Sequence, residues 1–204
     1  MSPRSAADNQ RRRDATRARI LTQALKLFAA RGYASTPVDA IVRAARCSPG
    51  LLYHYFPSKQ ALLTTLFEES MTDVRASFLA ADAEPDPRHR IGALLRASAD
   101  IVRGHREFWT LSYGVRMQRD VLAGLGPSLT AWTHGIVATL ARYLRDAGFP
   151  QPEMEAALLF AQIDGLLQHY VLDPRTYPLD ALIDALVDRY AQPFRKEHES
   201  GGVS

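Results

Sequence analysis

The chain has a single cysteine, Cys47, among its 204 residues, which excludes an internal disulfide bond. No cysteine and histidine spacing typical of a zinc site occurs either, so we expect neither a metal nor a cofactor. The first twenty residues are basic and polar, without the apolar run of a secretory signal. The chain has no stretch of about eighteen uninterrupted apolar residues, so no transmembrane helix is expected. These absences favour a cytoplasmic protein in a reducing compartment.

Positive charge is concentrated at one end of the chain. Residues 1–60 carry eleven Lys or Arg against three Asp, a net charge of +8, whereas residues 61–204 have a net charge of −5. A basic first third on an acidic body indicates a polyanionic partner for that third, although a solvated basic tail would give the same count. Residues 1–13, which include Arg11, Arg12 and Arg13, lack hydrophobic periodicity and are typical of a disordered basic tail.

Alternation typical of β-strands is absent, and apolar residues recur at helical spacing along most of the chain. The fold class expected is therefore all-α, with about nine helices. The first is expected from Thr16 to a left-handed cap at Gly32. Glycine and proline breaks then delimit later helices. The expected ranges are 36–45, 49–56, a long helix after Ser58, 88–104, 106–123, 127–147, 152–172 and 178–195.

Two short helices in succession, after a longer one, are typical of a helix-turn-helix. Thr36 is a residue type common at helix N-caps, and Pro37 follows it at the first helical position. Ser48 and Pro49 show the same pattern at the start of residues 49–56. The second helix of such a pair enters the major groove of DNA. Gly50 would let the backbone approach DNA closely. Of the three aromatic residues there, Phe56 suits the core, Tyr53 the surface, and Tyr55 either.

The run from Thr16 to Leu63 resembles the N-terminal domain of the TetR family of bacterial repressors. It reads TRARILTQALKLFAARGYASTPVDAIVRAARCSPGLLYHYFPSKQALL. The resemblance implies a helix-turn-helix DNA-binding domain over 14–60, a helical ligand-binding and dimerisation domain over 61–196, and a frayed tail over 197–204. The DNA-binding residues that it implies are Thr36, Arg46, Ser48, Pro49, Gly50, Tyr53, His54 and Lys59.

Two positions depart from the family pattern. Arg46 stands where glycine is usual, and a left-handed arginine costs about 1 kcal/mol, so a slightly reshaped turn is expected. The alternative is that Arg46 gains a phosphate contact. Pro49 stands where a polar residue is common, so any recognition there is apolar, for example of a thymine methyl. For Arg11–Arg13, a solvated tail competes with a minor-groove arm.

Residues 152–172 are apolar nearly all round, as expected of a helix buried on two sides, and residues 178–195 carry one apolar stripe. The pair resembles the family's four-helix dimer interface, although an intrachain core would explain the same leucines. The interface residues expected are Leu159, Asp164, Gly165, Leu167, Leu182, Leu186 and Tyr190. Aromatic residues of the middle helices suit an apolar ligand pocket or plain core. The pocket residues expected are Phe78, Trp109, Tyr113, Trp132 and Phe160.

The function expected is a DNA-binding transcriptional regulator, most simply a homodimeric repressor released from a palindromic DNA operator by a small hydrophobic or amphipathic ligand. It would be associated with the nucleoid when bound to DNA, and no membrane partner is expected. An enzyme is not expected, because no nucleophile elbow, phosphate loop or paired catalytic carboxylates are present. The alternative is an architectural or ligand-independent DNA-binding protein, for which the acidic body is a poor fit.

Overall fold

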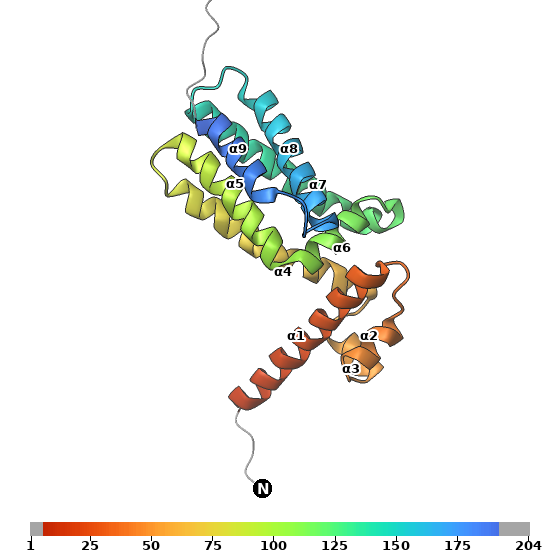
Figure 1. The fold of residues 1–204 in the computed structure, drawn as a ribbon. Helices are drawn as coiled ribbons and strands as arrows, with labels where there is room; N and C mark the ends of the chain where they lie inside the picture. The colour runs from red at the N-terminus through yellow and green to blue at the C-terminus, as the bar shows by residue number, and fades with distance from the viewer. Residues whose placement is uncertain (1–5, 192–204) are drawn as a thin grey trace, which may run out of the picture. The chain divides into compact units, whose positions relative to one another are not determined.

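The computed structural model describes residues 6–191, and the side chains in that range except those of residues 6, 7, 119, 120, 122–129 and 191. The described residues form nine helices and no strand, which confirms the all-α fold class (Figure 1). The helices are α1 (Ala6–Arg31), α2 (Val38–Ala44), α3 (Pro49–Tyr55), α4 (Lys59–Asp82), α5 (Pro87–Gly104), α6 (Arg106–Arg116), α7 (Arg119–Asp146), α8 (Pro152–Leu172) and α9 (Leu179–Ala191).

The chain divides into two compact units. The first contains residues up to 74 together with 103–129, and the second contains residues 75–102 with those from 130 onward. The expected domain boundary at residue 60 therefore differs from the division by contacts, because α6 packs along α1 and belongs to the first unit. An edge-to-face contact between Phe67 of α4 and Phe108 of α6, with ring centroids 5.1 Å apart, lies in the same core.

Helix α1 begins at Ala6, so the prediction of a disordered tail is wrong for the described residues 6–13. Local pairs account for the longer helix. Arg11 lies 2.6 Å from Asp8, three residues away, and the Gln10 amide donates to Asp14, four residues away, at 2.9 Å. Such pairs stabilise a helix without any burial. Residues 1–5, and the expected tail at 197–204, lie outside the described residues.

The break between α6 and α7 falls at Met117 and Gln118, and not at residues 124–127 as glycine and proline suggested. The Gln118 side chain donates to the Gly114 carbonyl at 3.0 Å, and its backbone N–H donates to the Val115 carbonyl at 2.9 Å. These polar contacts end α6. Helix α7 then continues through Pro127, which removes only one backbone hydrogen bond from a long helix.

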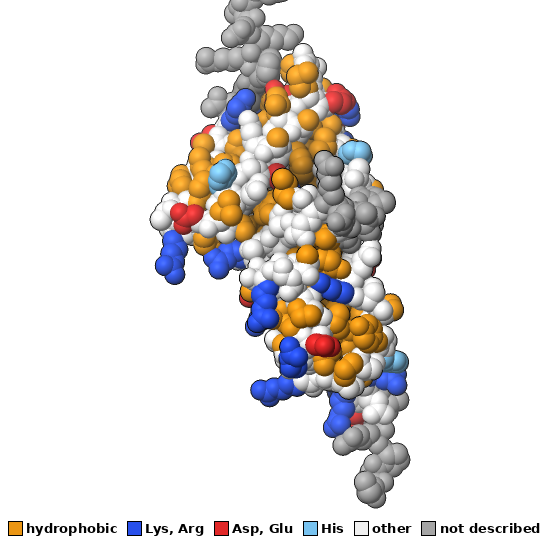
Figure 2. Space-filling model, turned by 90° about the vertical axis from the view of Figure 1, so that its right-hand side faces the viewer, with side chains coloured by type: hydrophobic (Ala, Val, Ile, Leu, Met, Phe, Trp, Pro, Cys, Tyr) orange, Lys and Arg blue, Asp and Glu red, His pale blue; other side chains and the backbone are white. Residues whose placement is uncertain are grey.

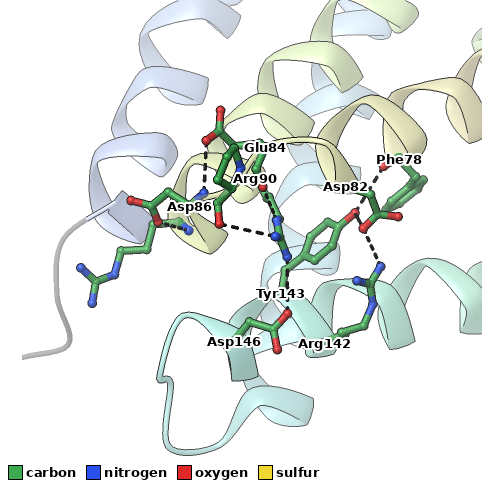
Figure 3. Close-up of polar contacts among 10 residues, drawn as sticks. Phe78, Asp82, Glu84, Asp86, Arg90, Arg142, Tyr143 and Asp146 are labelled. Atoms are coloured by element: carbon green, nitrogen blue, oxygen red, sulfur yellow. Dashed lines mark hydrogen bonds and ion pairs between the residues drawn. The ribbon is translucent and has the colours of Figure 1, made fainter.

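In the second unit, a polar network joins the end of α4 to α7 (Figure 3). The buried Tyr143 hydroxyl donates to Asp82 at 2.8 Å, and Arg142 donates to the same carboxylate at 2.8 Å. These hydrogen bonds, with Arg142 the stronger cause, lower the pKa of Asp82. At the α4–α5 turn, Arg90 donates to the Glu84 carbonyl and lies 3.5 Å from Asp146. The network fixes the start of α5 against α7.

Helices α8 and α9 pack against each other in the second unit. Leu159 of α8 and Ile183 of α9 are buried, and the Tyr190 hydroxyl donates to Glu155 at 3.2 Å. The expected end of the last helix at residue 195 lies outside the described residues. Among those residues, no helix has the length and hydrophobicity of a membrane span.

Candidate nucleic-acid interface

The turn between α2 and α3 has the hydrogen bonds of a helix that ends on a left-handed residue. The Arg46 N–H donates to the Arg43 carbonyl and the Cys47 N–H to the Val42 carbonyl, both at 3.2 Å. Arg46 has a φ of 48°, the only positive φ outside glycine among the described residues. Arg46 thus keeps the left-handed conformation, so the expectation of a reshaped turn is not met, and its side chain is exposed next to α3.

Helix α3 presents a largely exposed surface. Ser48 caps it as predicted, since its Oγ accepts a hydrogen bond from the Leu51 N–H at 3.2 Å. Within α3 only Leu52 is buried and anchors the helix to the core. The residues predicted to face DNA are exposed, namely Pro49, Gly50, Tyr53 and His54. Their side chains are therefore available to a partner.

The three aromatic residues of this region divide as the sequence suggested. Phe56 is 2% exposed and lies in the core, whereas Tyr53 keeps 48% of its surface. Tyr55 is half-buried, and its ring meets that of His54 edge to face at 5.3 Å. Tyr53 and His54 are thus the large side chains that α3 offers to DNA.

Arg19 of α1 holds the helix-turn-helix to the first helix. Its Nε donates to the Ala45 carbonyl at 2.8 Å, at the end of α2. No sequence pattern singled out Arg19, because an arginine beside a buried residue such as Ile20 is ordinary on a helix. The contact shows which face of α1 points toward the turn.

Two predicted DNA contacts have different roles in the structure. Thr36 is fully buried, and its hydroxyl donates to the carbonyls of Gly32 at 2.8 Å and Leu27 at 3.2 Å. The prediction that Thr36 caps α2 is wrong, since Pro37 is the N-cap and makes no side-chain cap. The DNA contact of Thr36 stays a prediction, and its side chain is buried within the chain. The Thr36 hydroxyl thus bonds to Leu27 in the last turns of α1 and to Gly32 directly after that helix.

The Lys59 side chain contacts the loop between α1 and α2. Its ammonium donates to the Ala34 carbonyl at 3.2 Å and lies 4.4 Å from the centre of the Tyr33 ring. Partial burial lowers the pKa of Lys59. Since an ammonium has three donors, a phosphate contact remains a prediction, but Lys59 also stabilises the loop.

Comparison with known proteins identifies the family. A model for bacterial regulatory proteins of the tetR family matches residues 20–66, and one for a tetracyclin repressor-like C-terminal domain matches residues 91–193. The chain belongs to the TetR family. The pair α2 and α3 lies within the segment that the tetR-family model matches, and it has the arrangement of a helix-turn-helix.

Individual relatives of this TetR-family chain match over different lengths. An uncharacterised HTH-type regulator of Bacillus subtilis, YuxN, is 51% identical over 47 residues, 23% of this chain and 16% of its own length. The HTH-type regulator TtgR of Pseudomonas putida is 28% identical over 85% of this chain and 88% of its own length. The first relatives found thus match over less than a third of their length.

Among solved structures, this chain has the fold of AibR, a protein crystallised with isovaleryl coenzyme A and operator DNA. The two superpose with a TM-score of 0.71 over 88% of this chain and all of AibR, at 21% sequence identity. At that identity, the similarity shows a shared fold.

The predicted pocket residues fall in both units. Trp109 and Tyr113 are buried in the first unit, with ring centroids 6.1 Å apart. Phe78, Trp132 and Phe160 belong to the second unit, where each is half-buried. No group of three or more candidate metal ligands occurs among the described residues.

The predicted dimer-interface residues differ in exposure, and the interface stays a prediction. Leu159, Leu167 and Tyr190 are at most 6% exposed and pack inside their own chain. The other predicted positions are half-buried, namely Asp164, Gly165, Leu182 and Leu186. The outward face of α8 instead carries Met154, Leu158 and Leu172, which are 61%, 49% and 73% exposed. Along α8, partner-facing and core-facing positions alternate every few residues. The sequence alone does not show which of the two faces is the core.

Proposed function

We propose that this regulator is a homodimeric repressor that binds a palindromic operator through α3 and is released by a small hydrophobic or amphipathic ligand. The observation that carries the proposal is the exposed surface of α3, where Tyr53 and His54 stand free of the core on a helix anchored by Leu52. In a helix-turn-helix, this surface is the part that reads the major groove.

Each exposed residue of the turn and of α3 suits a different kind of contact. The Arg46 guanidinium and the Ser48 hydroxyl suit phosphates, which orient the protein without reading sequence. Gly50 has open space where a Cβ would stand, so the backbone can approach the DNA there. Tyr53 and His54 carry the hydrogen-bonding groups that could distinguish base edges, and Pro49 offers an apolar surface to a thymine methyl.

The test of DNA recognition uses duplexes selected from a random-sequence pool with the wild-type protein. Replacing Tyr53 and His54 together by Ala should lower affinity for the selected sequence at least ~30-fold, because each base contact contributes about 1–3 kcal/mol. Binding to unselected DNA should change little. The matched control is His89→Ala, an exposed histidine on α5. Undiminished affinity of the double variant for the selected duplex would remove α3 as the recognition helix.

The proposed dimer uses the outward face of α8. Met154, Leu158, Gly165 and Leu172 are spaced by four, seven and seven residues, so they share one face of the helix. A Cβ at Gly165 would meet no atom within 4 Å, which leaves room for a partner backbone. Two copies joined through this face would present two recognition helices to two half-sites, as two-fold operators require.

The proposed effector has an apolar part. AibR, which has this fold, was crystallised with isovaleryl coenzyme A, an amphipathic thioester. Shifting a two-state regulator from mostly bound to mostly released takes roughly 5.5 kcal/mol of differential binding. Burial of about 200 Å² of apolar surface in one state supplies most of this at ~25 cal/mol/Å². The half-buried side chains of Phe78, Trp132 and Phe160 are the candidates for the apolar lining.

The effector test exploits the two tryptophans, which lie in different units. Trp109→Phe leaves Trp132 as the reporter of the second unit, and Trp132→Phe leaves Trp109 as the reporter of the first. Each variant is titrated with acyl coenzyme A thioesters of increasing chain length, beside an assay of DNA release on the same compounds. Release with a change in Trp132 fluorescence supports an effector site in the second unit. Fluorescence changes without release would argue against an effector role for these thioesters.

A further inference from the structure

Helix α1 begins well before the core of its unit. Its first fully buried residue is Ile20, whereas every residue from Asn9 to Ala15 is exposed. Figure 1 shows this N-terminal part of α1 standing clear of α2 and α3. At 1.5 Å per residue, the segment from Asp8 to Ala15 extends the helix by roughly 12 Å beyond its packed part. We call residues 8–15 the α1 extension.

The α1 extension is not built to pack against its own chain. Positions seven residues apart lie on the same helix face. On that basis Arg13 and Asp14 take the places that Ile20 and Leu21 hold in the core, and both are exposed, whereas Ile20 and Leu21 are 0% and 4% exposed. The face that would have to be apolar for intrachain packing is therefore polar.

Some charged side chains of the α1 extension have partners within the helix, and others have none among the described residues. Arg11 is paired with Asp8 at 2.6 Å, and Asp14 accepts from Gln10 at 2.9 Å. These local pairs support the helix. Among the described residues, Arg12 and Arg13 make no ion pair and no hydrogen bond through their side chains. Figure 2 shows Lys and Arg side chains over the end of the molecule where α1 begins.

The position of Arg12 relates the extension to the DNA-binding surface. Arg12 precedes Arg19 by seven residues, so the two lie on one face of α1, about 10 Å apart along the helix. Arg19 donates to the carbonyl of Ala45, directly before Arg46 in the helix-turn-helix turn. Arg12 therefore continues the side of α1 that faces this turn. Along a duplex whose axis runs parallel to α1, at 3.4 Å per base pair, 10 Å corresponds to about three base pairs.

We propose that the α1 extension is a second DNA contact, in which Arg12 and Arg13 bind phosphates about three base pairs from those nearest the helix-turn-helix turn. This inference rests on the proposed DNA-binding function and adds a contact outside α2 and α3. Arginine suits the role because its guanidinium stays charged and donates in a fork that matches phosphate oxygens. Contacts of this kind add affinity and salt dependence without sequence preference.

The experiment measures the affinity of the full chain for its selected duplex between 50 and 200 mM salt, for wild type, Arg12→Ala/Arg13→Ala and Arg12→Lys/Arg13→Lys. Each lost phosphate contact should reduce the salt slope by about 0.9, hence by about 3.6 for two arginines in each of two subunits. Wild-type affinity should then fall ~100-fold more than that of the alanine variant over this range. The lysine variant should keep most of the wild-type slope, because it keeps the charge.

A second arm removes flanking DNA from the duplex in steps of one base pair. Wild type should lose affinity as the flank is shortened, while the alanine variant should be indifferent to it. Arg88→Ala, an arginine in α5 of the second unit, controls for general loss of charge. Equal slopes and equal flank dependence in wild type and the alanine variant would overturn the extension contact while leaving DNA binding by α3 intact. Failure of the wild type to select any duplex would overturn the proposed function itself.

Discussion

At the scale of single residues, Arg46 is the position where stability and DNA binding oppose each other. Its φ of 48° is unfavourable for any residue with a Cβ. Arg46→Gly should raise the free energy of unfolding by about 1 kcal/mol, which corresponds to roughly 2–4 °C in Tm for a chain of this size. The same variant should bind DNA more weakly, since an exposed guanidinium next to α3 is lost. Calorimetry and DNA titration on one preparation measure both effects.

The control for Arg46→Gly is Arg43→Gly, three residues earlier. Arg43 is also exposed, but it lies inside α2, where glycine lowers stability by about 1 kcal/mol. The two substitutions remove the same side chain and should move Tm in opposite directions. A fall in Tm for both variants would show that relief of the left-handed arginine is not the dominant effect.

Thr36 has a structural role that can be separated from DNA contact. Thr36→Val removes a buried hydroxyl that serves the carbonyls of Leu27 and Gly32, and it should cost about 1–2 kcal/mol of stability. Affinity for DNA at a temperature where the variant is folded should remain close to wild type. Thr36→Ser keeps the hydroxyl and should recover most of the stability. A large affinity loss in a fully folded Thr36→Val protein would support Thr36 as a DNA contact.

The residue-scale comparison shows which local rules are reliable here. Ser48 caps α3 as predicted, because nothing competes for its hydroxyl in an exposed turn. Thr36 is also a hydroxyl residue directly before a helix, yet its hydroxyl donates to the Gly32 carbonyl at the end of α1. The difference is burial, which brings the carbonyls of Leu27 and Gly32 within reach of the hydroxyl and cannot be read from the residues around Thr36.

At the scale of helices, the number and order of elements could be predicted, and some boundaries could not. Apolar spacing located α4 and α8, since a long amphipathic or buried helix repeats its signal over many residues. The start of α1 and the break between α6 and α7 depend on side-chain pairs such as Asp8 with Arg11, and on the contacts of Gln118. Such contacts produce no periodic pattern of apolar residues in the sequence. Tertiary packing likewise decides which face of α8 is buried.

The network between α4 and α7 predicts sensitivity to alkali. Burial, followed by the hydrogen bond to Asp82, raises the pKa of Tyr143 from 10.0 to about 12. A raised folded-state pKa means that this contribution to stability is complete below pH 10 and is lost as the pH rises through 12. Tyr143→Phe should cost about 1 kcal/mol near neutral pH and should flatten the loss of stability above pH 10. Urea unfolding at a series of pH values measures both.

Tyr170→Phe is the control for the Tyr143 prediction. The Tyr170 hydroxyl has no hydrogen bond to another described residue, and the side chain is half-buried. Its removal should leave the pH profile unchanged. Tyr190, whose pKa burial and Glu155 also raise to about 12, remains in both variants and sets a common background. Equal pH profiles for Tyr143→Phe and wild type would contradict the role of the Tyr143 hydroxyl.

At the scale of the whole molecule, the positive charge is concentrated in the part of the chain that matches the family's N-terminal domain. Residues 1–60 are strongly basic and carry the helix-turn-helix, while the rest of the chain is acidic. The acidic remainder would be repelled by DNA, which favours contact through one end of the chain only. In the proposed homodimer, two such ends are presented at a fixed spacing, so the dimer interface would decide whether both copies of α3 fit a palindrome.

The outward face of α8 therefore yields the prediction that bears on the whole molecule. Leu158→Glu places a carboxylate on that face, and burying it unpaired against a second copy costs several kcal/mol, enough to weaken dimerisation at least ~100-fold. Leu79→Glu makes the same change at a more exposed leucine on α4, 72% exposed compared with 49% for Leu158. Light scattering at matched concentrations should report monomers for the first variant and dimers for the second. Because Leu158 is largely exposed within its own chain, both variants should melt as folded proteins. If Leu158→Glu stays dimeric, the interface lies on another face of the chain, and the two recognition helices are spaced by contacts other than those of α8.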